Sequence, residues 1–161
     1  MEIYLLRHGI AEDRKPGGTD AERPLTTEGR EKLRRVLKRA RAAGAEPTLI
    51  LSSPLVRAKE TAELAAGLLD YNGKIVETRA LIPEASPHDV WEQLRARKDE
   101  QAILLASHEP LMSSLAAFLL DSPALQVDMK KGAIVRIDSE RLGTKPKAVL
   151  KWMITPAVVG L

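Results

Sequence analysis

Three short, uninterrupted apolar runs constrain the fold of this 161-residue chain more than any other feature. They cover residues 3–6, 48–51 and 102–106. A strand with one wet face alternates apolar and polar residues, whereas a strand covered on both faces is apolar throughout. Segments with helical periodicity separate the runs, and residues 133–138 and 148–155 alternate like an antiparallel pair. The sequence therefore predicts an α/β fold, a three-layer α/β/α domain with a mostly parallel sheet and an antiparallel C-terminal hairpin.

The predicted helices begin at capping or proline signals. These signals are Thr27, Ser53 followed by Pro54, Ser86 followed by Pro87, and Pro110. Gly44 is expected to end the first helix. A further strand is predicted within residues 74–78, and the polar residues 12–24 are predicted to form a loop. Because no repeat or linker interrupts the pattern, we expect one domain spanning residues 1–161.

Composition excludes several classes of function. The chain has no cysteine, so disulfide scaffolds, zinc–thiolate sites, iron–sulfur clusters and cysteine nucleophiles are excluded. With 25 basic and 22 acidic residues and only 3% aromatics, the chain lacks the pattern of a nucleic-acid binder. No apolar stretch approaches the roughly 20 residues of a membrane helix, and the N-terminus does not resemble a signal peptide. We expect a cytoplasmic protein without nucleic-acid or membrane partners.

Polar residues follow each of the three apolar runs. Arg7 and His8 follow the first, Ser52 and Ser53 the second with Arg57 shortly after, and Ser107 and His108 the third. In open α/β sheets the carboxyl ends of the strands line the ligand crevice. If the strands are parallel neighbours, two arginines and two histidines meet at one place. Such a cluster predicts an oxyanion ligand, and the arginine fork matches phosphate best.

Phosphate chemistry at this cluster needs a nucleophile. No cysteine is present and no carboxylate lies beside the arginines at a strand end, which leaves His8. A neutral imidazole can attack phosphorus and form a phosphohistidine, while Arg7 and Arg57 neutralise the equatorial oxygens. His108 is expected to bind a phosphate oxygen. Glu84, in the loop of residues 81–84, is the acid best placed by topology to protonate the leaving group.

The same segments resemble the signatures of the histidine phosphatase superfamily. Arg7-His8-Gly9 resembles its RHG signature, residues 51–62 (LSSPLVRAKETA) its second signature, and Ser107-His108 its third. Residues 23–29 (RPLTTEG) match the segment before the first long helix. The resemblance covers essentially the whole chain in the right order. The length, residues 107–111 and residues 152–156 look most like the SixA-type phosphohistidine phosphatases.

This resemblance implies a phosphoglycerate-mutase-like fold, no metal or cofactor, and specific roles. His8 matches the phosphorylated nucleophile, while Arg7, Arg57 and His108 match the rest of the phosphate pocket. Glu84 falls near the acid of the mutase-like members. Arg14 stands where larger members carry an asparagine. The length leaves little room for their insertion over the site, and an open site suits a protein substrate better than a small metabolite.

The sequence thus favours a metal-independent phosphatase that removes phosphate from phosphohistidine on a signalling or phosphotransfer protein. The alternatives are a small-molecule phosphomonoesterase and, in another class, a non-catalytic phosphate or phosphoprotein-binding module. A metallohydrolase using His8 and His108 is poorly supported, because no HxH or HExxH spacing occurs. Arg23 either contacts substrate or holds its loop. His88 is interpreted as a surface residue. The basic residues between 30 and 41 are interpreted as a solvated helix face, and the alternative is a docking surface for an acidic partner protein.

Overall fold

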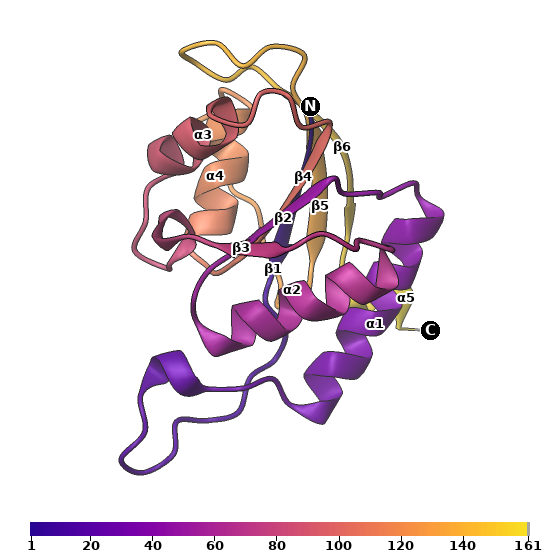
Figure 1. Cartoon of the computed structure of the whole chain (residues 1–161), viewed down its shortest axis with the longest axis vertical. Coiled ribbons are helices and arrows are strands. Elements are labelled where there is room, and N and C mark those ends of the chain that lie inside the picture. Colours follow the sequence, from indigo (N-terminus) through magenta and orange to yellow (C-terminus); the bar gives the residue numbers. More distant parts are fainter. Residues whose placement is uncertain (161) are drawn as a thin grey trace.

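The computed structural model describes residues 1–160 and is built around a six-stranded sheet of order β3-β2-β4-β1-β5-β6 (Figure 1). The parallel strands are β1 (Glu2–Arg7), β2 (Leu49–Ser52), β3 (Ile75–Glu77) and β4 (Ala102–Ser107). Strands β5 (Ile134–Asp138) and β6 (Val149–Ile154) run antiparallel. The predicted mostly parallel sheet with a C-terminal antiparallel pair is confirmed.

Helices cover both faces of this sheet. They are α1 (Thr27–Ala42), α2 (Val56–Leu68), α3 (Pro87–Arg95), α4 (Leu111–Leu119) and the short α5 (Pro156–Val159). Side chains alternate along a strand, so Tyr4 and Leu6 pack with α1 and α2, while Ile3 and Leu5 pack with α3 and α4. Because both faces of β1 are buried, its sequence is apolar throughout. None of the helices in residues 1–160 is long and apolar enough to span a membrane.

Two predicted helix starts are wrong, one by one residue and the other by two. The cap of α1 is Thr26 rather than Thr27, because the Thr26 hydroxyl accepts a hydrogen bond from the Gly29 N–H at 2.9 Å. Helix α2 begins at Val56, so Ser53 lies ahead of it and is not its cap. The Ser53 hydroxyl instead accepts from the Leu55 N–H at 3.3 Å in a local turn. The sequence did not predict three short elements: helix α5 and the 3₁₀ turns η1 (Asp20–Glu22) and η2 (Arg79–Leu81).

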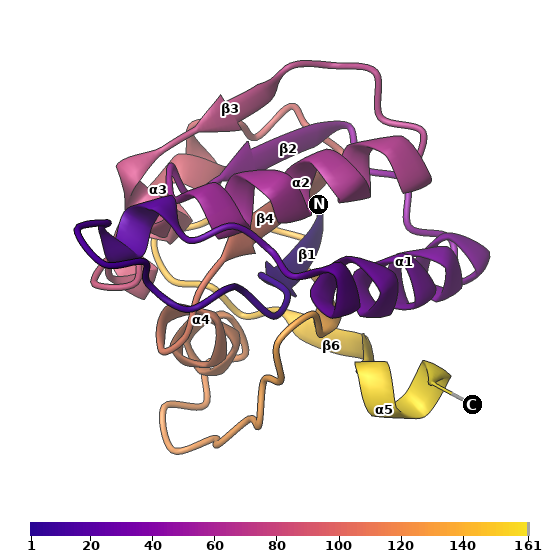
Figure 2. The ribbon, with the colours of Figure 1, turned by 90° about the horizontal axis from the view of Figure 1, so that it is seen from below.

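The strand register brings the polar strand ends to one edge. Strand β4 lies between β1 and β2, with Arg7 paired to Ser107 and Ser52 paired to Ala106. The next residue of β1 and of β4 is a histidine, so His8 and His108 leave the sheet side by side. Figure 2 views the molecule from this end. We call this end of the sheet the catalytic edge, after the phosphate chemistry that the sequence predicts there.

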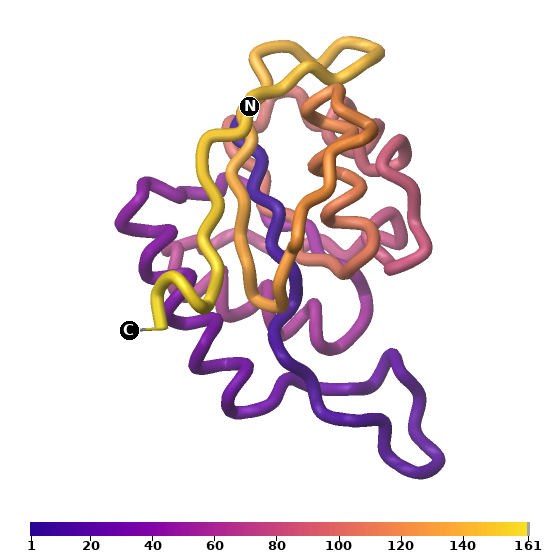
Figure 3. The backbone as a smooth tube through the Cα atoms, turned by 180° about the vertical axis from the view of Figure 1, so that it is seen from behind, coloured from indigo at the N-terminus to yellow at the C-terminus, as the bar shows by residue number. Residues whose placement is uncertain are grey.

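The connection between α4 and β5 returns to the catalytic edge, as the tube in Figure 3 shows. The Gly132 N–H donates to the carbonyl oxygens of Arg7 and His8 at 3.1 and 3.0 Å. Gly132 has a φ of +79°, a left-handed conformation that glycine adopts without steric cost. This turn therefore holds residues 129–132 against the end of β1.

Candidate active site

His8 and His108 form the centre of the catalytic edge. Their ring centroids are 5.1 Å apart with the planes tilted by 57°. The backbone fixes this placement, because the His8 N–H donates to the Ser107 carbonyl at 2.9 Å and the Ser53 N–H to the Ala106 carbonyl at 3.0 Å. The exposed fractions of His8 and His108 are only 7% and 1%. Both imidazoles are therefore held in a nearly dry, fixed geometry.

Arg57 reaches the same point from the first turn of α2. Its Nε lies 3.4 Å from the His8 Nε2, and the residue is 6% exposed. Its other two nitrogens contact turn η1: Nη1 donates to the Asp20 carbonyl at 2.9 Å and Nη2 to the Asp20 carboxylate at 3.1 Å. The guanidinium is thus held along one side by Asp20 and presents its Nε to His8.

Arg7 joins the cluster from the last residue of β1. Its Nη1 donates to the Met129 carbonyl at 2.7 Å, which ties Arg7 to the connection between α4 and β5. Among the described residues, the Arg7 Nε is a buried donor without a partner. Burial lowers the pKa of Arg7, and the carboxylates of Glu109 and Asp128 oppose that shift. An unpaired buried donor costs about 1–3 kcal/mol, and an oxyanion would satisfy it.

The hydrogen bonds of His8 define its tautomer. Its Nδ1 lies 2.7 Å from the Gly9 carbonyl oxygen. A carbonyl can only accept, so Nδ1 carries the proton and Nε2 carries the lone pair. Burial is the main cause that lowers the pKa of His8 to about 4, and the charges of Arg57, Arg7 and Lys131 add to it against the opposing Gly9 hydrogen bond. The ring is therefore neutral near pH 7, and the lone pair on its Nε2 accepts a long hydrogen bond from the Arg57 Nε–H.

His108 is neutral for a similar reason. Burial, followed by the neighbouring His8 and Arg57, lowers its pKa to about 3, although Asp20 acts in the opposite direction. Its Nε2 lies 2.7 Å from the Ser53 hydroxyl. Within residues 1–160, its buried Nδ1 has no hydrogen-bond partner. An oxyanion between the histidines would give this nitrogen one.

Thr61 connects α2 to the segment that carries His8. Its hydroxyl donates to the Arg57 carbonyl at 2.7 Å and accepts from the Gly9 N–H at 3.2 Å. The side chain is fully buried. Thr61 thus fixes the backbone after His8 relative to the helix that carries Arg57.

No hydrogen bond within residues 1–160 joins either histidine to the remaining residues that the sequence singled out: Arg14, Arg23, Glu84 and His88. Arg23 holds its loop, because its Nε donates to the Glu12 carbonyl at 2.6 Å and its Nη1 to the Asp20 carboxylate at 2.9 Å. Glu84 is exposed, in the turn after η2, and η2 is tied to the catalytic edge by the Ser107 hydroxyl, which donates to the Leu81 carbonyl at 2.6 Å. Arg14 and His88 are both exposed.

Sequence reasoning missed three contributors to the site: Asp20, Thr61 and the Met129 carbonyl. Asp20 is one of several acids in a polar loop, and nothing in its local pattern marks it. A main-chain carbonyl such as that of Met129 leaves no sequence signal. Thr61 lies within residues 51–62, the segment that resembles the second signature, and only this location indicated that it belongs to the site.

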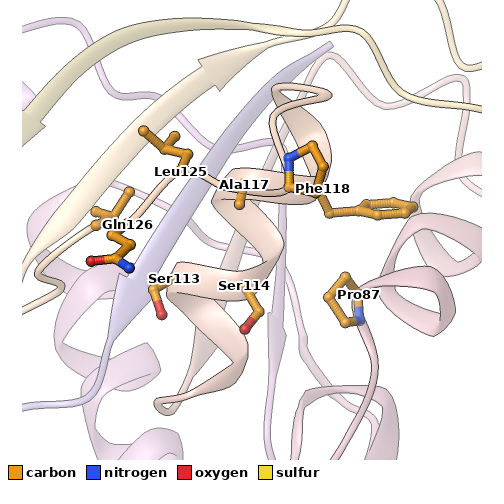
Figure 4. Close-up of a pocket in the computed structure, with 9 residues that line it drawn as sticks. Pro87, Ser113, Ser114, Ala117, Phe118, Leu125 and Gln126 are labelled. Atoms are coloured by element: carbon orange, nitrogen blue, oxygen red, sulfur yellow. The ribbon is translucent and has the colours of Figure 1, made fainter.

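A separate groove of about 420 Å³ lies beside α4 (Figure 4). Ser113 and Ser114 on α4 line it together with Pro87, Leu125 and Gln126. None of the four clustered arginines and histidines lines this groove. Across residues 1–160 there is also no group of three histidine or acidic side chains arranged to hold a metal ion.

Comparisons with known proteins identify the family. Residues 3–82 match the sequence profile of the histidine phosphatase superfamily (branch 1). The phosphohistidine phosphatase SixA of Escherichia coli is 30% identical over an alignment of 163 positions, which covers 97% of this chain and 94% of that protein. An uncharacterized protein of Picosynechococcus sp. is 32% identical over 141 residues, 86% of each chain.

A solved structure matches the fold as well. The protein histidine phosphatase SixA complexed with tungstate aligns with a TM-score of 0.83 and 24% identity, over 98% of this chain and 99% of that one. The predicted phosphoglycerate-mutase-like architecture is thereby confirmed. The signatures, the fold and the full-length relatives agree: this chain belongs to branch 1 of the histidine phosphatase superfamily, as a SixA-like phosphatase.

Proposed function

We propose that this protein hydrolyses phosphohistidine on a phosphorylated protein, through a phosphohistidine formed on its own His8. The observation that carries the proposal is the geometry of the His8 ring. Nδ1 is tied to the Gly9 carbonyl, so the lone pair on Nε2 faces the Arg57 Nε at 3.4 Å. A neutral nucleophile beside a fixed cation suits attack on an anionic phosphoryl group.

In the first step, the Nε2 lone pair of His8 forms a bond to phosphorus. The bond between phosphorus and the substrate nitrogen breaks, and its electron pair leaves with the substrate imidazole, which takes up a proton. Arg7, Arg57 and His108 stabilise the charge that spreads over the phosphoryl oxygens. Glu84 is our candidate for the proton donor, because η2 holds its loop against the catalytic edge.

In the second step, water attacks the phosphorus of phosphorylated His8. The bond between phosphorus and Nε2 breaks, its electron pair returns to Nε2, and inorganic phosphate leaves with both protons of the attacking water. The Gly9 carbonyl holds the ring in one orientation throughout, so the same lone pair is ready for the next cycle. Splitting the hydrolysis in this way replaces one difficult displacement with two easier ones.

Relatives support the substrate class. SixA of Escherichia coli is a phosphohistidine phosphatase, and it aligns with nearly the full length of this chain. Glu84 and the loop carrying Arg14 are exposed rather than buried beneath further chain. An open rim of this kind admits a phosphorylated side chain that is still attached to a protein.

The direct test is to replace His8 by alanine and measure hydrolysis of a protein phosphorylated on histidine. We expect a loss of at least about 10³-fold in kcat, because the nucleophile is gone. Brief incubation of the wild-type protein with ³²P-labelled substrate should leave acid-labile label on His8. The matched control is His88→Ala, which removes an exposed histidine of α3 and should change neither result.

Full activity of the His8→Ala variant, with an unchanged melting temperature, would refute the mechanism. Turnover of phosphohistidine protein should also exceed turnover of sugar and glycerate phosphates by the wild-type protein. The reverse ranking would identify a small-molecule phosphomonoesterase instead. Tight phosphate binding without turnover of any phosphoryl donor would identify a binding module.

A further inference from the structure

A basic groove adjoins the active site on the β5 side of the catalytic edge. It encloses about 780 Å³ and is lined by Arg7, Lys32, Arg35, Lys130 and Lys131, with Ile10 and the start of α5 supplying apolar surface. Arg7 belongs both to this groove and to the cluster around His8. Lys131 is close enough to contribute to the lowered pKa of His8. The groove therefore extends from Arg7, in the cluster where a phosphoryl group is expected, to Lys32 and Arg35 of α1.

The charges in the groove are unbalanced. Among residues 1–160, five cationic side chains line it and no carboxylate does. Two of the cations have acidic neighbours: Lys32 pairs with Glu28 at 2.9 Å and Lys130 with Asp128 at 3.1 Å. Within residues 1–160, Arg35 and Lys131 make no ion pair. Like charges gathered in a concave surface attract an anionic partner and repel a cationic one.

The basic surface continues along α1. A second hollow, of about 540 Å³, is lined by Arg35, Lys38 and Arg39 together with Val158 and Val159 of α5. Lys32, Arg35 and Arg39 are spaced by three and four residues, which places them on one face of the helix. Helix α5 lies beside α1 in both Figure 1 and Figure 2, and Val158 is 70% exposed.

We propose that this basic strip (Lys32, Arg35, Lys38, Arg39, Lys130 and Lys131) is the docking surface for an acidic face of the phosphorylated protein substrate. The inference rests on the proposed function and adds the partner's chemistry to it. In isolation, the cations of α1 are typical of a solvated helix face. In the folded chain, Lys130 and Lys131 line one groove with two cations of α1 and with Arg7. An acidic protein docked on the strip would therefore lie next to the residues around His8.

Apolar surface gives the strip a second kind of contact. Ile10, Pro156 and Ala157 line the groove among the cations, and the exposed Val158 lies beside Arg39 in the neighbouring hollow. Protein interfaces combine an apolar centre with a charged rim. A duplex nucleic acid would present phosphates without an apolar surface, so the mixture favours a protein partner.

The test compares two substrates with a phosphorus–nitrogen bond, an acidic protein phosphorylated on histidine and the small donor phosphoramidate. The variant is Arg35→Glu/Arg39→Glu, which reverses two exposed charges of the strip away from His8. We expect kcat/KM for the acidic phosphoprotein to fall at least about tenfold, chiefly through KM, since charges at an interface rim set the association rate. Hydrolysis of phosphoramidate should stay within about twofold, because this small donor has no acidic protein face to dock on Arg35 and Arg39.

Three controls sharpen this test. Arg34→Glu makes the same charge change on an exposed residue of α1 that lines neither hollow, and should leave both activities unchanged. A basic protein phosphorylated on histidine should gain no advantage from the wild-type strip. Raising the salt concentration should lower kcat/KM for the acidic phosphoprotein more steeply in the wild type than in the double variant.

The outcomes separate the two proposals. If the double variant hydrolyses the acidic phosphoprotein as well as the wild type does, the docking surface is refuted and the proposed function stands. If the wild type hydrolyses neither the phosphoprotein nor phosphoramidate, the proposed function fails and the docking surface fails with it. Tighter binding of a DNA duplex than of the acidic phosphoprotein, lost in the double variant, would assign the strip to nucleic acid instead.

Discussion

At the scale of single residues, Asp20 is the least expected member of the site. Its carboxylate bridges Arg23 and Arg57, and its carbonyl accepts a further hydrogen bond from Arg57. The hydrogen bond from Arg23, followed by the charge of Arg57, holds the pKa of Asp20 below its ordinary value. The carboxylate is therefore ionised near pH 7. We interpret Asp20 as a positioning residue that keeps the Arg57 Nε directed at His8.

The variant Asp20→Ala should lower kcat for phosphoramidate about fivefold, because Arg57 loses a fixed partner. The pair is partly exposed, so its loss should cost only about 0.2–1 kcal/mol of stability, or a few degrees in Tm. Steady-state kinetics and thermal unfolding measure the two effects separately. Asp20→Glu should recover part of the activity.

The matched control for this prediction is Asp13→Ala, which removes an exposed carboxylate from the same loop. It should leave kcat unchanged. Equal kcat for Asp20→Ala and the wild type would show that Arg57 does not depend on Asp20 for its orientation.

At the scale of secondary structure, the contact between α1 and the chain after β1 has almost no free space. A Cβ built on Gly29 would overlap the main chain of Ile10, and one on Gly9 would lie 2.6 Å from the Leu33 side chain. The main chain of Thr26 also donates to the Ile10 carbonyl at 2.9 Å. This packing places the start of α1 directly beside the segment that carries His8.

The variant Gly29→Ala should therefore destabilise the protein, although alanine is the better helix former. We expect a loss of about 1–3 kcal/mol from overpacking against a backbone that cannot move freely. Gly67→Ala is the control, because a Cβ there meets nothing within 4 Å. It should stabilise α2 by about 0.5–1 kcal/mol. Denaturant unfolding of both variants checks the prediction, and equal effects would contradict it.

At the scale of the whole molecule, the buried histidines couple stability to pH. Folding lowers the pKa of His8 to about 4 and that of His108 to about 3, against about 6.5 in an unfolded chain. At pH 7 the histidines are mostly neutral in both states, so the coupling is weak. As the pH falls below about 6.5, the unfolded chain takes up protons that the native chain excludes, and the native state loses stability.

We expect the free energy of unfolding to fall by about 1–2 kcal/mol per buried histidine between pH 7 and pH 5. Urea unfolding at several pH values measures this slope. In His108→Gln the fall should be smaller, because one of the two coupled groups is gone. An equally steep fall in that variant would assign the pH dependence to other groups.

Local patterns of the sequence predicted much of this molecule. Apolar runs such as residues 3–6 marked the buried strands, and the residues following them marked the catalytic edge. The clustering of His8 and His108 was predictable because the carboxyl ends of parallel strands lie at the same end of the sheet. The caps were predicted less well, since Thr26 and Thr27 are chemically alike and only the contact with Ile10 selects between them.

By itself, the sequence determined the α/β class, the four clustered arginines and histidines, and the family to which the chain belongs. Only the tertiary structure decided which ring nitrogen of His8 holds the lone pair, which carboxylate pairs with Arg57, and that lysines after Met129 join the basic face of α1. Each of these depends on contacts between distant segments, such as Arg7 with Met129, 122 positions apart. Periodicity and capping act over a few residues, whereas the positions of such partners follow from the packing of the whole chain.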